Sequence, residues 1–498
     1  SLSLTANTTG ANNVAMGYAA LDANTTGQNQ VAIGVNALTA NTTGIRNTAI
    51  GQSALAANTT ADWNVAVGAY ALDANTTGTQ NTAVGSAALG ENTTGGQNTG
   101  VGYGALDANT TGSNNTSLGW GALTTSTTDT ANTAVGDSSL YTLDGGDYNT
   151  AIGYLSLRLA TTADNCTAAG YNALGSNTTG SNNTAVGHHS LTSNTTASNN
   201  TAVGRESLEN NTTGADNTGI GRQAMKANTT GDHNVGIGQE ALEANTTGSY
   251  NIAVGSHALD ANTTASGNIA VGYDALNDNT TGAYNVAVGI NALVSNTTAS
   301  DNVAVGRNAG MGTTTGSYNT VVGKNAGDGI TTGENNLCLG IDSGRANAPS
   351  GNITTGDNNV CLGNNNIANL YCADTSISSS DARDKTDVED FKYGLSWINE
   401  LRPVTYRWDR RTWYSDDKSV KPDGSKKRDR LHIGFLAQEA IEVEKKHGYA
   451  DKKDNFLVAN QDEDEANPSY GIKYERLVPV LVNAIKELSA KVKALEAK

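Results

Sequence analysis

Apolar residues recur along most of the chain with a period of 17 residues. An anchor glycine stands at every seventeenth position from Gly17 to Gly340, and one more follows at Gly363. Ala-Val or Ala-Ile usually precedes the anchor glycine and Ala-Leu often follows it, as in "GYAALDANTTGQNQVAI". This unit is too short for a helical pair, and its Asn, Thr and Gly disfavour helix. The pattern therefore predicts a mainly β fold, a parallel β-solenoid with one coil per repeat, about 4.8 Å apart.

The two apolar segments of each repeat predict two strands that face a thin core. Neighbouring residues on a strand point to opposite faces. If Val84 and Leu89 fill the core of their own coil, Ala83 must face outward. A column of outward alanines would let a second chain approach closely. Twenty such coils would form a rod of about 95 Å.

The two glycines of the repeat differ in their tolerance of substitution within this one chain. The anchor glycine never changes, which predicts either a positive φ or a backbone contact that leaves no room for a Cβ. Alanine replaces the glycine after Asn-Thr-Thr in four coils, at Ala61, Ala197, Ala265 and Ala299. Only a small residue is needed at this second position.

The Asn-Thr-Thr triplets predict a stacked turn. Asn favours turns, and Asn side chains in register can hydrogen-bond from coil to coil. An alternative makes the Thr columns an ice-binding face. Thr25 and Thr26 are adjacent, however, and would point to opposite sides of a strand. The repeat weakens between residues 124 and 169, a segment that could bind a ligand or metal or bend the rod.

After residue 380 the pattern becomes that of an ordinary α/β domain. Residues 401–408 alternate like a strand, and residues 433–437 lead into the helical pattern "QEAIEVEKK". The C-terminal residues 478–498 show the 3-4 apolar spacing of a coiled coil. The seam consists of Val478, Leu481, Ile485, Leu488, Val492 and Leu495. In simple peptides, such a seam favours two strands.

Composition changes at the same boundary. Residues 1–380 contain 8 of the 31 Lys and Arg but 25 of the 48 Asp and Glu, a net charge of −17, and the remainder is neutral. We therefore expect three regions: the repeat array (1–363), a linker (364–380) and a C-terminal domain (381–498). An acidic array disfavours nucleic-acid binding. No apolar run reaches the ~20 residues of a membrane helix, so membrane insertion is not expected.

Four cysteines, Cys166, Cys338, Cys361 and Cys372, lack the spacing of a disulfide framework or a zinc site. We expect them to be small buried apolar residues. Six aromatic residues follow anchor glycines directly and could stack on sugars, although isolated exposed aromatics are common without function. They are Tyr18, Tyr103, Trp120, Tyr154, Tyr171 and Tyr273. The pattern predicts neither a metal site nor a cofactor.

The array resembles the head repeats of trimeric autotransporter adhesins. Their N-x-A-[IV]-G motif is matched by "NTAVG" at Asn81–Gly85 and at Asn200–Gly204. The resemblance implies a left-handed parallel β-roll that assembles as a trimer. The period in that family is usually shorter than 17, so the outline of the coil does not carry over. The chain begins partway through a repeat, and we expect any N-terminal anchor to lie outside this sequence.

Residues 378–498 resemble the endosialidase-type intramolecular chaperone of phage tail spikes and fibres. The motifs "SDARDK", "LRPVTYRW", "HIGFLAQE" and "YERLVPVLVNAIKEL" occur in the family's order. The resemblance implies a domain that trimerises, guides three chains into a fibre and cuts itself off at a Ser-Asp bond. Here that bond joins Ser380 to Asp381, with Ser380 as nucleophile and Lys385 as its base.

This chemistry is plausible for the residue types. A serine hydroxyl needs a base to take its proton, and a desolvated lysine can stay neutral enough to do so. Asp384 departs from the family, which often has an aliphatic residue there, and a nearby carboxylate would favour protonated Lys385. Attack within one chain and attack between chains both stay open. His432, Gln438 and Glu439 are possible supporting residues.

The sequence thus predicts a homotrimeric tail fibre or spike of a virion that attaches to a host-surface glycan or receptor. A single self-cleaving serine endopeptidase step is its expected enzymatic activity. The alternative is a cell-surface or ice-binding adhesin that uses the Asn-Thr-Thr ladders as its binding face. A tail-spike glycosidase is disfavoured, because the acids of the array form no repeating pair.

Overall fold

The computed structural model describes residues 3–367, 388–411, 414, 420–451, 455–461 and 470–497. The chain divides into two compact units. The first holds the array through Arg345 together with Ile353–Gly363. The second holds Ala346–Asn352 and the chain from Asn364 onward. The two units are described separately below.

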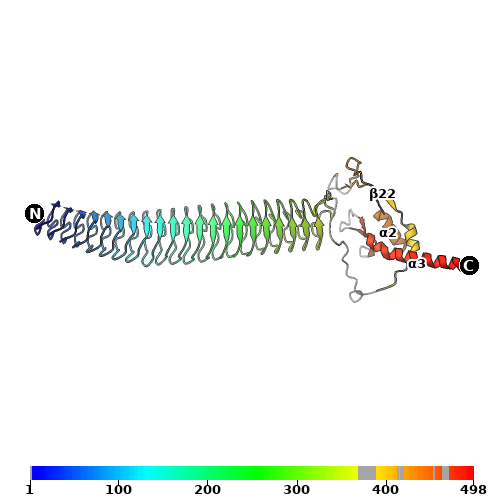
Figure 1. Ribbon diagram of the computed structural model, residues 1–498, viewed down its shortest axis with the longest axis horizontal. Helices are drawn as coiled ribbons and strands as arrows, with labels where there is room; N and C mark the ends of the chain where they lie inside the picture. Colours follow the sequence, from blue (N-terminus) through cyan, green and yellow to red (C-terminus); the bar gives the residue numbers. More distant parts are fainter. Residues whose placement is uncertain are drawn as a thin grey trace. The chain divides into compact units, whose positions relative to one another are not determined.

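The first unit is a single parallel sheet of 21 short strands, one per coil, in sequence order (Figure 1). Strands that are adjacent in sequence pair in register, so that Ala15 lies beside Ala32 and each position forms a column along the rod. The strands are β1 (Val14–Met16), β2 (Val31–Ile33), β3 (Thr48–Ile50), β4 (Val65–Val67), β5 (Thr82–Val84), β6 (Thr99–Val101), β7 (Thr116–Leu118), β8 (Thr133–Val135), β9 (Thr150–Ile152), β10 (Thr167–Ala169), β11 (Thr184–Val186), β12 (Thr201–Val203), β13 (Thr218–Ile220), β14 (Val235–Ile237), β15 (Ile252–Val254), β16 (Ile269–Val271), β17 (Val286–Val288), β18 (Val303–Val305), β19 (Thr320–Val322), β20 (Leu337–Leu339) and β21 (Val360–Leu362). The predicted β-solenoid is confirmed.

The core of the array differs from the prediction in two respects. Ala83 is fully buried, whereas Val84 is 37% exposed, so the prediction of an outward alanine column was wrong. Each coil also has one strand rather than two, because Ala-Leu lies in a turn in which Leu89 has a φ of 53°. Leu89 fills the thin core from that turn. Gly100 occupies the inward strand position of the next coil. A Cβ built on Gly100 would lie 3.4 Å from Leu89 Cγ, so there is room there only for a small residue.

The anchor glycines meet both conditions that the sequence predicted. Gly85 has a φ of +135°, and a Cβ built on it would lie 2.3 Å from the carbonyl oxygen of Gly102 in the next coil. L-residues adopt this φ only with strain, and a backbone oxygen cannot move aside as a side chain can. Alanine does replace the second glycine, and Ala61 is buried there with 2% exposure. Both predictions are confirmed.

Buried asparagines form the predicted coil-to-coil ladders. Asn41 Nδ2 donates to Asn24 Oδ1 at 3.0 Å and to the Gly44 carbonyl at 3.3 Å. A second ladder lies just before the strands, where the Asn64 backbone N–H donates to Asn47 Oδ1 at 2.9 Å. These side chains are fully buried. Their hydrogen bonds offset the cost of burying amides and hold each coil in register with the next.

The Asn-Thr-Thr triplet lies in a turn, not in a strand. Thr25 Oγ1 donates to the Thr42 carbonyl of the next coil at 3.0 Å. Thr26 is exposed. The first threonine is therefore part of the internal hydrogen bonding, and only one exposed Thr column remains, which does not form the two-column plane of an ice-binding face.

The irregular segment 124–169 keeps the strand register through β7–β10. Its carboxylates accept hydrogen bonds from backbone N–H groups, Asp129 from Gly145 at 2.7 Å and Asp164 from Asp147 at 2.8 Å. Burial raises the pKa of Asp129. Within the described residues, no group of three or more His, Cys, Asp and Glu is arranged to hold a metal ion.

The second unit is a small α/β structure. Helix α1 (Leu395–Glu400) precedes an antiparallel pair of β22 (Val404–Tyr406) with β23 (His432–Gly434). Helix α2 (Ala437–Lys446) is followed by the pair β24 (Ala459–Gln461) and β25 (Tyr470–Ile472), the short 3-10 helix η4 (Tyr474–Arg476) and the long helix α3 (Leu477–Glu496). Among the described helices, none has both the length and the apolarity to cross a membrane.

Candidate functional site

The predicted cleavage residues Ser380, Asp381 and Lys385 lie outside the described residues, which stop at residue 367 and resume at residue 388. Their roles stay predictions. The array before them and the α/β unit after them are described, and these are the parts that a cut at this point would separate.

The three possible supporting residues have different surroundings. His432 in β23 stacks on Tyr406, with ring centroids 5.6 Å apart. Gln438 is exposed in the first turn of α2. Glu439, in the same turn, pairs with Arg402, whose Nε lies 3.2 Å from Glu439 Oε2. The structure thus gives His432 and Glu439 separate partners and does not bring these residues together.

A buried carboxylate in α2 holds the α/β unit together. Glu444 is fully buried, and it accepts backbone N–H bonds from Leu457, Val458 and Ala459 at 2.7–2.8 Å. Backbone donors of this kind satisfy a buried charge that would otherwise be costly. Sequence reasoning missed Glu444. Glu444 lies four residues after Ala440 and on the same helix face, but the sequence alone does not indicate the backbone groups that it binds.

Helix α3 has two apolar faces. Leu477, Val480 and Ala484 are buried, and the first two pack in a core around Trp397. All six residues of the predicted coiled-coil seam are exposed, from 44% at Leu481 and Val492 to 70% at Leu495. A long helix with an apolar stripe on its solvent side has surface available for partner helices.

The array also exposes a continuous apolar surface, here called the outer stripe: the third residue of every strand from Met16 to Leu362. All of these residues except Ala169 are Val, Ile, Leu or Met. Val203 is 36% exposed and Ile220 38% exposed, and other members range from half-buried, as at Ile33 and Val254, to 64% exposed at Met16. Single exposed apolar residues are ordinary, but a line of them along the whole sheet exceeds what a monomer usually leaves uncovered.

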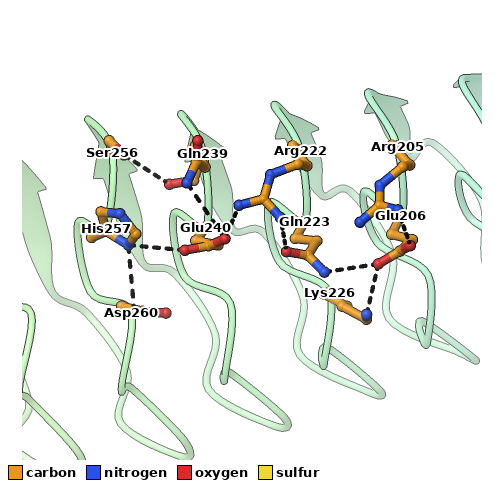
Figure 2. A network of polar contacts seen from close by, with 10 residues as sticks. All are labelled: Arg205, Glu206, Arg222, Gln223, Lys226, Gln239, Glu240, Ser256, His257 and Asp260. Carbon is orange, nitrogen blue, oxygen red and sulfur yellow. Dashed lines mark hydrogen bonds and ion pairs between the residues drawn. The ribbon is translucent and has the colours of Figure 1, made fainter.

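A polar cluster of the array lies on the turn after the anchor glycines, across coils 204–260 (Figure 2). Glu206 accepts hydrogen bonds from Lys226 at 2.7 Å and Gln223 at 2.8 Å. Further along, His257 Nδ1 lies 3.1 Å from Glu240, which also pairs with Arg222. Most of these contacts join one coil to the next, so the cluster supports the stacking of coils.

This cluster predicts a pH-dependent stability. Two hydrogen bonds lower the pKa of Glu206 to about 2. The bond from Lys226 has the larger effect, and the bond from Gln223 has the next largest. Because the unfolded pKa is about 4.3, the ionised carboxylate stabilises the folded array above that pH, and this contribution disappears as the pH falls toward 2. At pH 7, the Lys226→Met chain should have a free energy of unfolding lower than that of wild type by about 1 kcal/mol or less. It should therefore melt at a lower temperature.

The difference in melting temperature between Lys226→Met and wild type should shrink between pH 4.5 and pH 2. Melting curves followed by circular dichroism at pH 7, 4.5, 3 and 2 measure it. Lys324→Met, which removes a lysine outside the cluster, is the control. A Lys226 effect that stays constant down to pH 2 would contradict the assigned pKa.

Exposed aromatics form two columns, of which the sequence predicted one. In the predicted column, Tyr154 stacks on Tyr171 at 5.7 Å and Tyr171 on His188 at 5.1 Å, so neighbours cover the ring faces. The second column precedes the buried asparagine of each coil, and its members are Trp63, Tyr148, His233, Tyr250, Tyr284 and Tyr318. His233 stacks on Tyr250, with ring centroids 5.0 Å apart. The recurring "YN" dipeptide is the signal that could have indicated it.

Three of the four cysteines lie among the described residues and are buried, as predicted: Cys166, Cys338 and Cys361. Burial raises the pKa of Cys166 to about 11, which keeps this thiol protonated at neutral pH. Cys372 lies outside the described residues.

Comparison with known proteins gives one finding. Residues 380–449 match the family model Peptidase_S74, described as the chaperone of endosialidase. No curated protein matches the chain. The match starts at Ser380, spans α1, β22, β23 and all of α2, and ends before α3. The C-terminal region is therefore similar to an intramolecular chaperone of a peptidase family, and it follows a β-solenoid of the kind that forms fibres.

Proposed function

We propose that the chain forms the shaft of a homotrimeric phage tail fibre or spike, assembled by a C-terminal chaperone that cuts itself off between Ser380 and Asp381. The observation that carries this proposal is the family match starting at Ser380, in a chain whose preceding part is a solenoid of 21 strands. A peptidase-family chaperone behind a rigid rod is suited to aligning the chains of that rod and then leaving. The mature shaft would belong to a virion and attach to a host-surface glycan or receptor.

In the proposed cleavage, the Ser380 hydroxyl attacks the carbonyl carbon of the Ser380–Asp381 bond. Lys385 takes the hydroxyl proton and returns it to the departing nitrogen of Asp381. Water then hydrolyses the ester and restores the hydroxyl. Attack by a serine on its own carbonyl would close a strained four-membered ring, whereas attack by Ser380 of another chain forms an ordinary ester. This geometry favours a reaction between chains and ties cleavage to assembly.

The outer stripe supports lateral association of identical chains. The stripe repeats once per coil over the whole array. A partner that covers it must be equally long and have the same rise per coil, and a second copy of this chain meets both conditions. The stripe also contains no charged residue, so association there buries none of the acidic side chains. The exposed seam of α3 provides a second, separate surface for the same partners.

We predict that lysines on the outer stripe disrupt the trimer. Val186→Lys, Val203→Lys and Ile220→Lys together would place three cations in an apolar interface, where burying them is costly. Sedimentation equilibrium of the mature shaft should give three chains per particle for wild type and single chains for the triple variant.

Lysines at exposed threonines of the Asn-Thr-Thr turn, Thr213→Lys and Thr230→Lys, form the control and should leave the trimer intact. A triple stripe variant that stays trimeric would show that the interface lies elsewhere. Wild-type protein that sediments as single chains would contradict the proposed function, and two chains per particle would agree with the two-stranded preference of the seam instead.

A further inference from the structure

Two of the buried cysteines lie side by side at the C-terminal end of the array. Cys338 is the middle residue of β20 and Cys361 the middle residue of β21, and the two are register partners. They are 0% and 4% exposed, so both lie in the core. Residues in register on neighbouring strands have Cα atoms about 4.8 Å apart, within the span of about 4.4–6.8 Å that a disulfide can bridge.

The third described cysteine has different neighbours. Cys166 lies in the column of buried asparagines, where its backbone N–H accepts no carbonyl partner but donates to Asn149 Oδ1 at 3.0 Å. Asn183 occupies the same position in the following coil. Cys166 therefore has asparagines on both sides along its column and serves as an internal comparison for the pair.

The core has room for the two sulfur atoms because the nearby turn lacks its usual leucine. Gly344 stands at the turn position that Leu89 fills in its own coil. A Cβ on Gly344 would lie 2.8 Å from Cys338 Sγ, so the sulfur takes part of the space of the missing side chain. The preceding coil fills the same space with valine, since Val321 Cγ1 would lie 2.5 Å from a Cβ on Gly327. Filling the core thus requires an apolar side chain but not a thiol.

The two thiols share a hydrogen bond in the folded array. This hydrogen bond, followed by burial, raises the pKa of the Cys338 thiol. Because the thiolate is the reactive form, the pair is protected while the coils stay closed. Among the described strands, β21 is the last of the array and stacks on β20. A coil at the end of a stack is where local opening should start.

We propose that Cys338 and Cys361 form a disulfide that fastens the last coil of the array to the coil before it. The oxidant is a small disulfide such as oxidised glutathione. When the last coil opens, one cysteine thiolate attacks the small disulfide and releases one small thiol, and the second cysteine then displaces the other. Two S–H bonds break and one S–S bond forms between the cysteines. Two electrons and two protons pass to the small disulfide, which becomes two thiols.

The proposed link would protect the C-terminal end of the array from opening. It joins two coils whose connection includes residues 346–352, which belong to the second compact unit. A cross-link restricts the open states of the segment that it closes, so opening becomes rarer. This proposal concerns the array alone, and it holds whether or not the chain is cut after Ser380.

The test uses full-length protein incubated with oxidised glutathione. The temperature is raised until the amides of residues 353–363 exchange, so that the thiols become accessible. The protein is then unfolded in guanidinium chloride with N-ethylmaleimide, which labels every remaining thiol. Peptide mass spectrometry should find Cys338 linked to Cys361 and label on Cys166. The amides of residues 353–363 should exchange about tenfold more slowly in oxidised than in reduced protein.

A chain with both Cys338→Val and Cys361→Val is the matched control, because Val321 shows that valine fits this space. Its exchange should not respond to the oxidant. Cys372→Ser should form the link as wild type does. Label on both Cys338 and Cys361 after the terminal amides have exchanged would overturn the proposal. A link from either residue to Cys372, loss of the link in Cys372→Ser, or equal exchange in oxidised and reduced protein would also overturn it.

Discussion

A chain with Ser380→Ala should keep its C-terminal region, whereas wild-type protein should lose residues 381–498. The substitution removes the nucleophile of the proposed cleavage and changes little else, because Ser380 is one of three consecutive serines. Electrospray mass spectrometry of the purified protein reads the outcome directly, since the intact chain has a mass of 51.1 kDa. The expected effect is complete loss of processing.

Lys385→Ala should also block the cut, because the hydroxyl then lacks its base. Lys385→Arg should do the same, since a guanidinium stays protonated and cannot take a proton. Ser379→Ala, one residue from the nucleophile, is the matched control and should be processed like wild type. Cleavage of the Ser380→Ala chain at the same bond, or an intact wild-type trimer, would contradict the proposed mechanism.

The proposed cut would determine what kind of stability the fibre has. Once the chaperone had left, the element that brought the chains into register would be missing, and an unfolded shaft could not reassemble as it first did. The lifetime of the mature fibre would then depend on the rate of unfolding rather than on an equilibrium. We attribute the regularity of most of the array to this requirement, because hydrogen-bond ladders that repeat from coil to coil oppose local unfolding.

Much of the array could be predicted from the sequence because one chain contains many versions of the same coil. A repeat position that never varies, such as the anchor glycine, is constrained by the backbone. Gly85 has a positive φ, and the carbonyl oxygen of Gly102 lies close to where a Cβ would be. The direction of the strand residues could not be predicted this way. Ala83 and Val84 are both apolar, and only the volume of Leu89 in the core decides that the smaller one points inward.

The C-terminal region was less predictable for a different reason. The helix at 478–498 has a local periodicity, and its exposed seam agrees with the pattern. Glu444 owes its importance to backbone groups of residues 457–459, which no local pattern connects to α2. The aromatic column before the buried asparagines was missed because tyrosine occupies it in only a few coils, among them those of Tyr250, Tyr284 and Tyr318.

The two glycines of the repeat allow a test of what the array tolerates. Gly221 is an anchor glycine with a φ of +137°, and a Cβ there would lie 2.3 Å from the Gly238 carbonyl oxygen. Gly214 is the second glycine of a coil, and a Cβ there would lie 2.4 Å from the Gly231 carbonyl oxygen. The steric contacts are nearly equal, but only Gly221 has a backbone conformation that L-residues avoid.

Gly221→Ala should therefore destabilise its coil by about 3 kcal/mol, from backbone strain added to the steric contact. Gly214→Ala should cost about 1 kcal/mol or less, because the chain already accepts alanine at Ala61 and Ala197. Hydrogen exchange resolved to residues 204–238 measures both, since the Gly221 variant should expose the amides of neighbouring coils while distant coils stay protected. Equal exchange in the two variants would mean that close packing alone, and not the left-handed φ, keeps the anchor column free of side chains.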